Sequence, residues 1–343
     1  MRLLVLGGTR FVGRSLVHEA LRRGDEVTAL HRGVSGATPE GAETIQIDRR
    51  VGGALDDALG DREWDAVIDT WSGAPMVVRE SALLLRRRAD HYGYVSSRSV
   101  YRWPWPQGVD ESAPVVEGEA GSADEDDYAS AKRGAELAVL EAFPGRALIA
   151  RAGLILGPYE DVGRLPWWLD RLGRGGRVPA PGPAERKLQY IDTRDLAAWM
   201  LAAVERGLVG TFNTVSTPGH ATMGQLLEAC NEVVGQGAEL VWLSPEVVQA
   251  AGVTGWVDLP IWVPPSGEMA GLHDGDVSRA YAEGLTCRPV HETVADTWRW
   301  LRTAGRPDPR PDRPPLGLSD DVERALSDAM DAPGPDPSAD RRG

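Results

Sequence analysis

The stretch LVLGGTRFVG, residues 4–13, decides the fold. It joins an apolar run, typical of a parallel strand covered on both faces, to a segment with apolar residues at helical spacing that ends at Gly24. Glycines between such a strand and helix let backbone amides approach a pyrophosphate closely. Gly7 and Gly13 occupy the expected positions, but Arg10 stands where a middle glycine is usual. An arginine at the centre of a glycine turn is unusual, so Arg10 is expected to have a specific role there.

The rest of the N-terminal half alternates strand and helix. EVTALHR, TIQID, DAVIDT and YGYVSS read as strands, and residues 75–89 and 126–143 read as helices. This pattern predicts an α/β fold, a doubly wound parallel sheet of the Rossmann type with a smaller C-terminal substrate lobe. We expect residues 1–157 to form the dinucleotide-binding domain, with 186–216 returning to it. Residues 158–185 and 217–303 would form the substrate lobe, and 304–343 a Pro-rich linker, a short helix and a disordered tail.

Composition narrows the function classes. The 343 residues carry a net charge of −14, which argues against nucleic acid or an anionic membrane as a partner. No apolar run approaches the roughly 18–20 residues of a membrane span. The two cysteines, Cys230 and Cys287, form neither a metal-binding spacing nor a disulfide framework. We therefore expect a cytoplasmic protein with no metal site.

Acidic residues cluster between residues 109 and 127, where VDESAPVVEGEAGSADEDD holds eight acids and no base. We expect a solvated loop rather than a binding segment.

The residues after the glycine turn indicate which dinucleotide would bind. An NAD site usually places an acid about 20 residues after the glycines, where it binds the ribose 2′-hydroxyl. Here the second strand ends with His31 and Arg32, and no acid lies between Val27 and Thr38. Arg10 and Arg32 would together bind a 2′-phosphate, so we predict NADP(H) rather than NAD(H) as cofactor. The alternative is that both arginines are solvated surface groups.

Other cofactor contacts follow from position. Asp48 ends the third strand, where it could accept a hydrogen bond from the adenine amino group. The full set of expected cofactor-binding residues is Gly7, Thr9, Arg10, Phe11, Val12, Gly13, Arg32, Asp48, Thr70, Trp71, Ser96, Tyr128, Lys132 and Gly153.

Tyr128 and Lys132 are the strongest catalytic candidates. They are four residues apart, so a helix would place both on one face, where the ammonium would stabilise a phenolate. The chain has 35 Arg but only two Lys, Lys132 and Lys187. A lysine in so arginine-rich a chain suggests a role that a guanidinium cannot fill. Ser96, Ser97 and Ser99 of YVSSRSVY lie at the carboxyl end of the fifth strand. There they would supply a second hydrogen-bond donor to the carbonyl oxygen of a substrate.

The glycine turn, YVSSRSVY, YASAK, ARAGLILGP and QYIDTRDLA together resemble the extended short-chain dehydrogenase/reductase superfamily, the NAD(P)-dependent epimerase/dehydratase group, over about residues 1–303. The resemblance implies that Ser97 is the catalytic Ser/Thr, Tyr128 the acid/base and Lys132 the residue that holds the nicotinamide ribose. It also implies a homodimer through the helices 75–89 and 126–143, unless the acidic segment covers that surface.

Departures from the family pattern point to a reductase. Arg98 and Ser99 replace the acid pair of sugar dehydratases, and Leu188 stands where sugar-nucleotide epimerases usually have a phosphate-binding Arg, although Arg186 or Lys187 could compensate. We expect an NADPH-dependent reductase of a carbonyl or imine on an apolar or aromatic metabolite. The alternatives are a sugar-nucleotide epimerase and a silent dinucleotide sensor or RNA-binding protein. The expected substrate contacts are Trp71, Trp103, Trp105 and Trp168.

Overall fold

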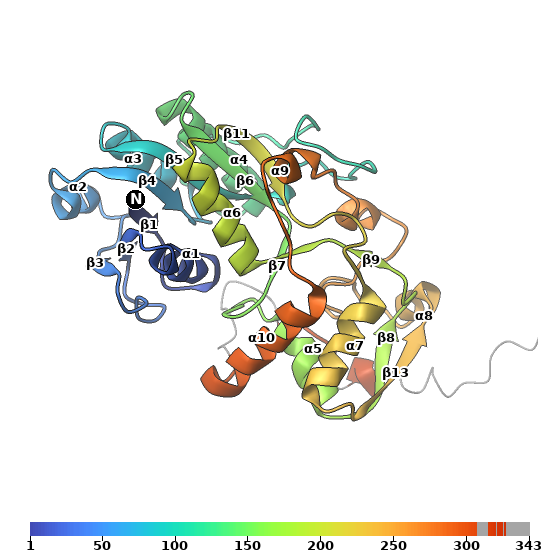
Figure 1. Ribbon diagram of the computed structural model, residues 1–343. Coiled ribbons are helices and arrows are strands. Elements are labelled where there is room, and N and C mark those ends of the chain that lie inside the picture. The colour runs from blue at the N-terminus through green and yellow to red at the C-terminus, as the bar shows by residue number, and fades with distance from the viewer. Residues whose placement is uncertain (307–314, 320, 325, 327–343) are drawn as a thin grey trace, which may run out of the picture.

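The computed structural model describes residues 1–306, 315–319, 321–324 and 326. A parallel sheet forms its centre, with seven strands in the order β11-β6-β5-β4-β1-β2-β3 (Figure 1). These strands are β1 (Arg2–Leu6), β2 (Glu26–His31), β3 (Glu43–Gln46), β4 (Trp64–Asp69), β5 (Ala89–Ser97), β6 (Ala147–Ala152) and β11 (Gly210–Thr214). The strand order reverses beside β1, which confirms the predicted doubly wound fold.

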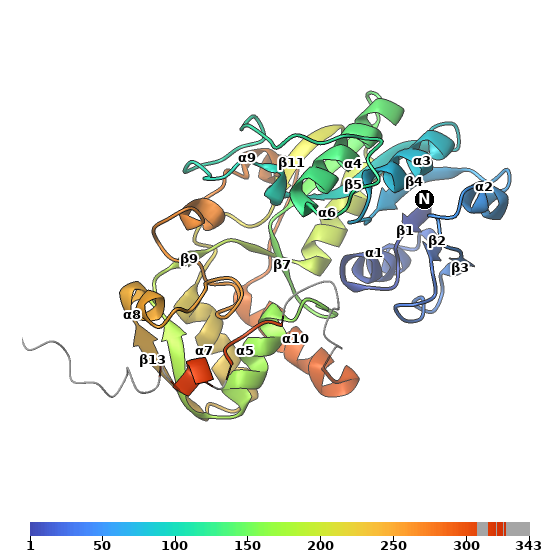
Figure 2. The ribbon, with the colours of Figure 1, turned by 180° about the vertical axis from the view of Figure 1, so that it is seen from behind.

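Helices cover both faces of the sheet, which Figures 1 and 2 view from opposite sides. α1 (Phe11–Arg22) and α6 (Thr193–Glu205) pack on one face, whereas α2 (Ala54–Leu59), α3 (Pro75–Leu85) and α4 (Tyr128–Ala142) pack on the other. Successive residues of a strand point to opposite faces. In β1, Leu3 and Val5 therefore join the first core, and Leu4 and Leu6 join the second.

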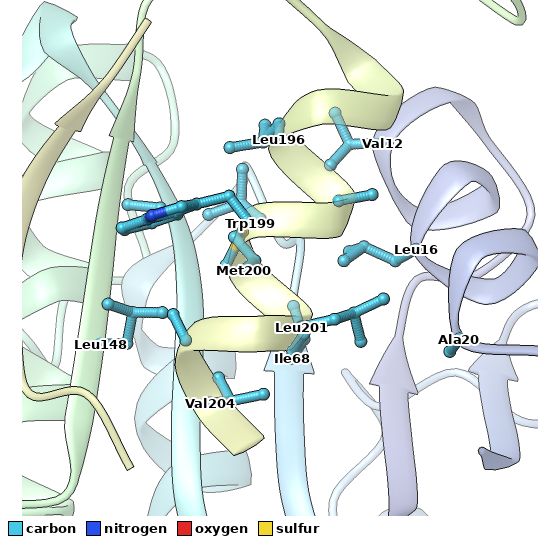
Figure 3. Close-up of a cluster of buried hydrophobic side chains, with 14 of the residues drawn as sticks. Val12, Leu16, Ala20, Ile68, Leu148, Leu196, Trp199, Met200, Leu201 and Val204 are labelled. Atoms are coloured by element: carbon cyan, nitrogen blue, oxygen red, sulfur yellow. The ribbon is translucent and has the colours of Figure 1, made fainter. Parts of the chain in front are cut away.

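The first core is built around α6. Leu196, Met200 and Val204 lie along this helix, close to Leu16 of α1 and Ile68 of β4 (Figure 3). Burial of these side chains fixes α6 across the sheet and so places the N-terminus of α6 at the carboxyl edge of the strands.

The second lobe has its own core around the fully buried Trp168 and the nearly buried Trp262. Its elements, with the short strands that lead to it, are β7 (Leu154–Leu156), α5 (Arg164–Gly173), β8 (Gly176–Pro181), β9 (Lys187–Leu188), β10 (Tyr190–Asp192), β12 (Ala221–Thr222), α7 (Met223–Val234), β13 (Ala238–Leu243), α8 (Pro245–Ala250) and α10 (Val290–Ala304). α9 (Ser278–Ala282) instead places Ala280 in the first core. The domain boundaries given above stay a prediction.

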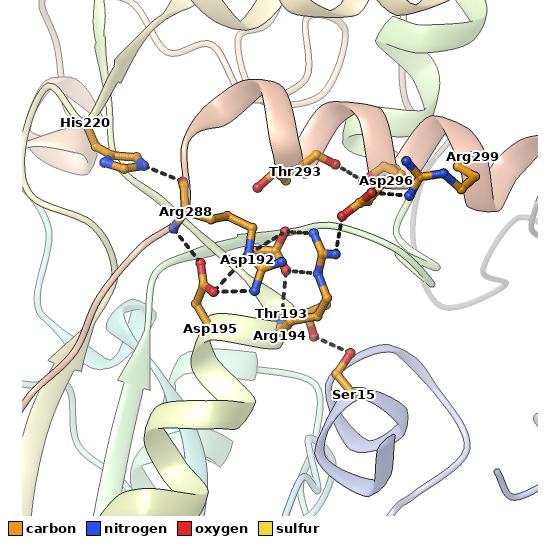
Figure 4. A network of polar contacts seen from close by, with 11 residues as sticks. Ser15, Asp192, Thr193, Arg194, Asp195, His220, Arg288, Thr293, Asp296 and Arg299 are labelled. Carbon is orange, nitrogen blue, oxygen red and sulfur yellow. Dashed lines mark hydrogen bonds and ion pairs between the residues drawn. The ribbon is translucent and has the colours of Figure 1, made fainter. Parts of the chain in front are cut away.

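A polar network joins the two lobes at the carboxyl edge of the sheet (Figure 4). Asp192 caps α6 by accepting the backbone N–H of Arg194 at 2.9 Å and also pairs with the Arg194 guanidinium. Arg194 reaches Asp296 of α10, and Arg288 binds Asp195 of α6 with Nη2 at 2.6 Å from Oδ1. The start of α6 is therefore tied to the final helix of the second lobe.

The C-terminal predictions fall mostly outside the described residues. This applies to most of the Pro-rich linker, residues 307–314, and to the expected disordered tail from residue 327. Residues 321–324 are helical, and Leu318, Val322 and Leu326 pack against the core of the second lobe.

The acids of the acidic segment are mostly solvated, as expected, but the backbone of the segment packs on two helices. The backbone of Gly118 lies against α4, where an added Cβ would be 2.5 Å from the amide nitrogen of Gly134. The backbone carbonyl of Ser122 accepts the N–H of Met76 at 3.0 Å, and a Glu125 carboxylate oxygen accepts the N–H of Ala74 at 3.2 Å. The segment therefore packs on the N-terminal end of α3 and on the middle of α4, and most of its acids remain exposed.

Within the part of the chain that the structure describes, we find no helix whose length and apolar character would let it cross a membrane.

The glycine turn between β1 and α1 requires its glycines. Gly7 has φ +105°, and an added Cβ would be 2.3 Å from Thr70 Oγ1. An added Cβ on Gly13 would be 1.7 Å from the carbonyl oxygen of Gly7. α1 can therefore begin this close to the strand only when residue 13 has no side chain. The first N–H groups of α1 are thereby placed at the carboxyl edge of the sheet, where they can bind an anion.

We expect Gly13→Ala to destabilise the fold by about 1–3 kcal/mol, because the methyl group cannot fit without moving the turn. Thermal unfolding measures this loss. Gly121→Ala is the matched control, since an added Cβ there meets nothing within 4 Å. Equal melting temperatures for the two variants would contradict the close contact.

Candidate functional site

The two arginines predicted to bind a phosphate lie at the carboxyl edge of the sheet. Arg10 is the N-cap residue of α1, and its exposed guanidinium lies 3.6 Å from Asp161. Arg32 directly follows β2 and is exposed. The neighbouring His31 is engaged within its own loop, where Nδ1 accepts the N–H of Gly33 at 3.0 Å. Both guanidinium groups are thus exposed at this edge of the sheet, and their role as an anion site stays a prediction.

Asp48 has a different partner from the one we expected. Its carboxylate accepts hydrogen bonds from the Arg50 side chain, with Nη2 at 2.6 Å, and these bonds lower the pKa of Asp48 to about 2. A bond to an adenine amino group would have to share this carboxylate with Arg50.

A buried cluster that the sequence did not reveal supports the loop after β4. Asp69, fully buried at the end of β4, forms two hydrogen bonds with Arg49 at 2.6 and 2.8 Å. It also accepts the Tyr92 hydroxyl at 2.8 Å and the backbone N–H of Trp71 at 2.9 Å. Thr70, the next predicted contact, donates to the carbonyl of Leu6 at 3.0 Å. The loop that carries Thr70 and Trp71 is therefore held from several sides.

Lys132 lies at the centre of the site. Its ammonium donates to the carbonyl oxygens of Trp71 at 2.6 Å and Val95 at 2.7 Å, and it lies 4.7 Å from the centre of the Tyr94 ring. Burial lowers the pKa of Lys132 to about 7, although Asp69 and Glu136 act in the opposite direction. The ammonium thus connects α4 to the loop after β4 and to the carboxyl end of β5.

The two other predicted catalytic residues lie on elements that pack together. Ser97 ends β5, and its hydroxyl oxygen accepts the N–H of Ser99 at 3.1 Å and lies 3.0 Å from the Ser99 hydroxyl. Tyr128 is the first residue of α4 and is 37% exposed. It lies near the phenol of Tyr94, whose pKa burial raises. α4 contacts both β5 and the short helix Arg98–Val100, so the three candidate side chains come from adjoining elements.

Ser96 and Gly153, both expected to bind the cofactor, pack against other parts of the protein. Ser96 is buried and donates its hydroxyl to Glu136 at 2.7 Å, so it points into the α4 interface. An added Cβ on Gly153 would be 2.5 Å from a methyl group of Val215. Sequence reasoning missed Glu136, because its partners Ser96 and Arg151 lie far from it along the chain.

The four candidate tryptophans divide into two groups. Trp71 and Trp103 are partly buried, and the Trp103 ring stacks on that of Trp105 at 4.1 Å. Trp105 is only 6% exposed, and Trp168 is fully buried with its indole N–H donating to the carbonyl of Pro260 at 2.7 Å. Their burial argues against a substrate contact for Trp105 and Trp168, whereas Trp71 adjoins Lys132.

Among the described residues no group of His, Cys, Asp and Glu side chains could hold a metal ion.

Comparison with known proteins gives the family. Residues 3–214, well over half of the chain, match the model of the NAD dependent epimerase/dehydratase family. The chain is 27% identical over 246 residues to the uncharacterized protein y4nG of Sinorhizobium fredii; the match covers 66% of this chain and 58% of that protein. It thus spans less than two thirds of that relative's length.

The chain is also 26% identical to sterol demethylase protein B of Methylococcus capsulatus, over 89% of this chain and 99% of that protein. The crystal structure of the Bordetella bronchiseptica enzyme WbmH in complex with NAD+ superimposes with a TM-score of 0.66 at 18% identity, over 89% of this chain and 99% of that one. At this identity the superposition shows the shared fold. From the family match, the chain belongs to the NAD dependent epimerase/dehydratase family.

Proposed function

We propose that this protein is an NADPH-dependent reductase of a ketone or imine carried on an apolar metabolite. The observation that carries the proposal is the environment of Lys132. Its ammonium is buried at the carboxyl ends of β4 and β5, four residues after Tyr128 and beside the strand that ends in Ser97. This arrangement joins a proton donor, a second hydrogen-bond donor and a cation at one edge of the sheet.

The glycine turn fits a nicotinamide dinucleotide, because Gly7 and Gly13 leave the backbone bare where a pyrophosphate would approach. When bound, the dinucleotide supplies the hydride. The Tyr128 hydroxyl gives its proton to the carbonyl oxygen of the substrate, and the Ser97 hydroxyl donates a hydrogen bond to the same oxygen. Lys132 stabilises the phenolate that remains, and its third N–H can bond a ribose hydroxyl.

Two features support NADPH over NADH. No acid follows β2, and Arg10 and Arg32 both stand exposed near the start of α1. A 2′-phosphate would therefore meet two guanidinium groups, of which Arg10 would have to release Asp161, 3.6 Å away.

The apolar substrate class rests on two partly buried tryptophans, Trp71, whose carbonyl accepts the Lys132 ammonium, and Trp103, which stacks on Trp105. The relative named for sterol demethylation is consistent with it, since a sterol is a large apolar molecule.

A sugar-nucleotide epimerase is the second candidate, because the family model includes epimerases. The position of the usual phosphate-binding arginine is held by Leu188, which is fully buried. Arg186 is engaged elsewhere, where Nη2 donates to the carbonyls of Ala270 at 3.0 Å and Pro264 at 3.3 Å. These contacts disfavour a diphosphate held by Arg186, which leaves the exposed Lys187 as the cation that could still bind one.

We also propose that the protein is a homodimer through α3 and α4. The acidic segment packs on the N-terminal end of α3 and the middle of α4, so pairing would use their C-terminal halves, where Leu140 is 38% exposed.

Wild-type protein should bind NADPH more tightly than NADH by about 1.5–3 kcal/mol, the range of charge-assisted hydrogen bonds. Arg32→Glu should reverse this preference because it places a carboxylate against the 2′-phosphate. Isothermal titration calorimetry with both cofactors measures it, with Arg206→Glu, an exposed arginine just after α6, as control. Equal dissociation constants in the wild type would exclude the two-arginine site.

Tyr128→Phe should lower turnover about 10²–10⁴-fold, because the ring is retained but the proton is lost. NADPH affinity should stay the same. Lys132→Arg should be nearly as damaging, since a planar guanidinium cannot occupy the place of the ammonium. Single-turnover oxidation of NADPH by a panel of aromatic and alicyclic ketones measures this, with Lys187→Arg as the matched lysine control. Wild-type rates in Tyr128→Phe would refute the assignment.

A further inference from the structure

The carboxylate of Glu136 is fully buried in α4, one helical turn after Lys132. It accepts four hydrogen bonds from three elements. Their donors are Ser96 Oγ of β5 at 2.7 Å, Arg151 Nε and Nη2 of β6 at 2.9 Å each, and Arg133 Nη1 of α4 at 2.9 Å. A buried carboxylate with all its partners in place fixes the groups around it, since moving any of them leaves a charge unpaired.

The hydrogen bond between Ser96 and Glu136 holds the carboxyl end of β5 against α4. Ser96 lies between Val95, whose carbonyl accepts the Lys132 ammonium, and Ser97. The Ser96 side chain points to α4, where it meets Glu136, and Ser97 follows it as the last residue of β5. One hydrogen bond therefore sets the register of α4 against both residues.

Arg151 binds the Glu136 carboxylate through two hydrogen bonds. Arg151 is the register partner of Ser96 across the β5–β6 pair, and its guanidinium also lies 4.9 Å from the centre of the Tyr101 ring. From this position the Glu136 carboxylate acts on the buried ammonium four residues before it and raises the pKa of Lys132.

We propose that Glu136 is a positioning residue, which holds Lys132 and Ser97 in register through Ser96 and keeps a negative charge beside the ammonium. The inference rests on the proposed function for the roles of Lys132 and Ser97.

Other groups also face Lys132. Asp69 and Arg49 act on it from the β4 side, with opposite effects, and Tyr94 presents its ring from β5. Tyr128 stands one turn before it on α4. The test leaves all four unchanged, so a difference between variants is due to Glu136 or Ser96.

Glu136→Gln keeps the shape of the side chain and removes its charge. We expect kcat for NADPH oxidation to fall about 10–100-fold with KM little changed, because the reacting groups lose their register. We also expect the pH at which NADPH affinity declines to fall by about one unit, since the ammonium loses a neighbouring negative charge. Glu141→Gln, an exposed position of the same helix, should change neither.

Ser96→Ala is the milder variant, in case Glu136→Gln does not fold. It should lower kcat without moving the pH of the affinity decline, because the charge remains. Amide hydrogen exchange of residues 95–97 in the free protein should accelerate in both variants and not in Glu141→Gln.

The outcomes separate the two proposals. A protein that binds NADPH but reduces none of the ketones refutes the proposed function, while the affinity and exchange measurements still test Glu136. Unchanged pH dependence in Glu136→Gln together with unchanged exchange at residues 95–97 would overturn the inference.

Discussion

The site depends on one buried cation. The Lys132 ammonium donates two hydrogen bonds, to the carbonyl of Trp71 just after β4 and to that of Val95 near the end of β5. Removing an ammonium from water is costly unless it is hydrogen-bonded and faces negative charge. Asp69 and Glu136 provide that charge, yet each is already paired with an arginine, Arg49 and Arg151. Burial therefore outweighs these two charges and lowers the pKa of Lys132 to about 7. A lysine with such a pKa changes its protonation state near neutral pH when an anion or a phenolate approaches.

The local patterns of the sequence were sufficient for the fold and for part of the site. Gly7 and Gly13 lie between a buried strand and a helix, and this spacing predicted a tight turn with no room for a side chain. The structure shows that an added Cβ would clash at both positions. The helical spacing of Tyr128 and Lys132 likewise places them on one face of α4. The scarcity of lysine was informative because arginine is so frequent elsewhere in the chain.

The residues that sequence reasoning missed depend on long-range pairing. Asp69 meets Arg49 only because β4 and the loop after β3 end at the same edge, and Glu136 meets Arg151 only through the packing of α4 on β6. For the same reason Ser96 was expected at the cofactor, although it bonds to Glu136. Trp168 was expected at the substrate, although no local pattern distinguishes a core tryptophan from one that lines a pocket.

The pH at which Lys132 loses its proton tests the account most directly. With ¹³Cε-labelled lysine only two side chains give signals, and Lys187→Arg leaves Lys132 alone. We predict a pKa of about 7. Because this lies below the value in the unfolded chain, the unfolded state binds more protons between pH 7 and about 10.4, and the free energy of unfolding should rise with pH across that window relative to Lys132→Met. A titration near the ordinary lysine value of about 10.4 would contradict the burial of the ammonium at this site.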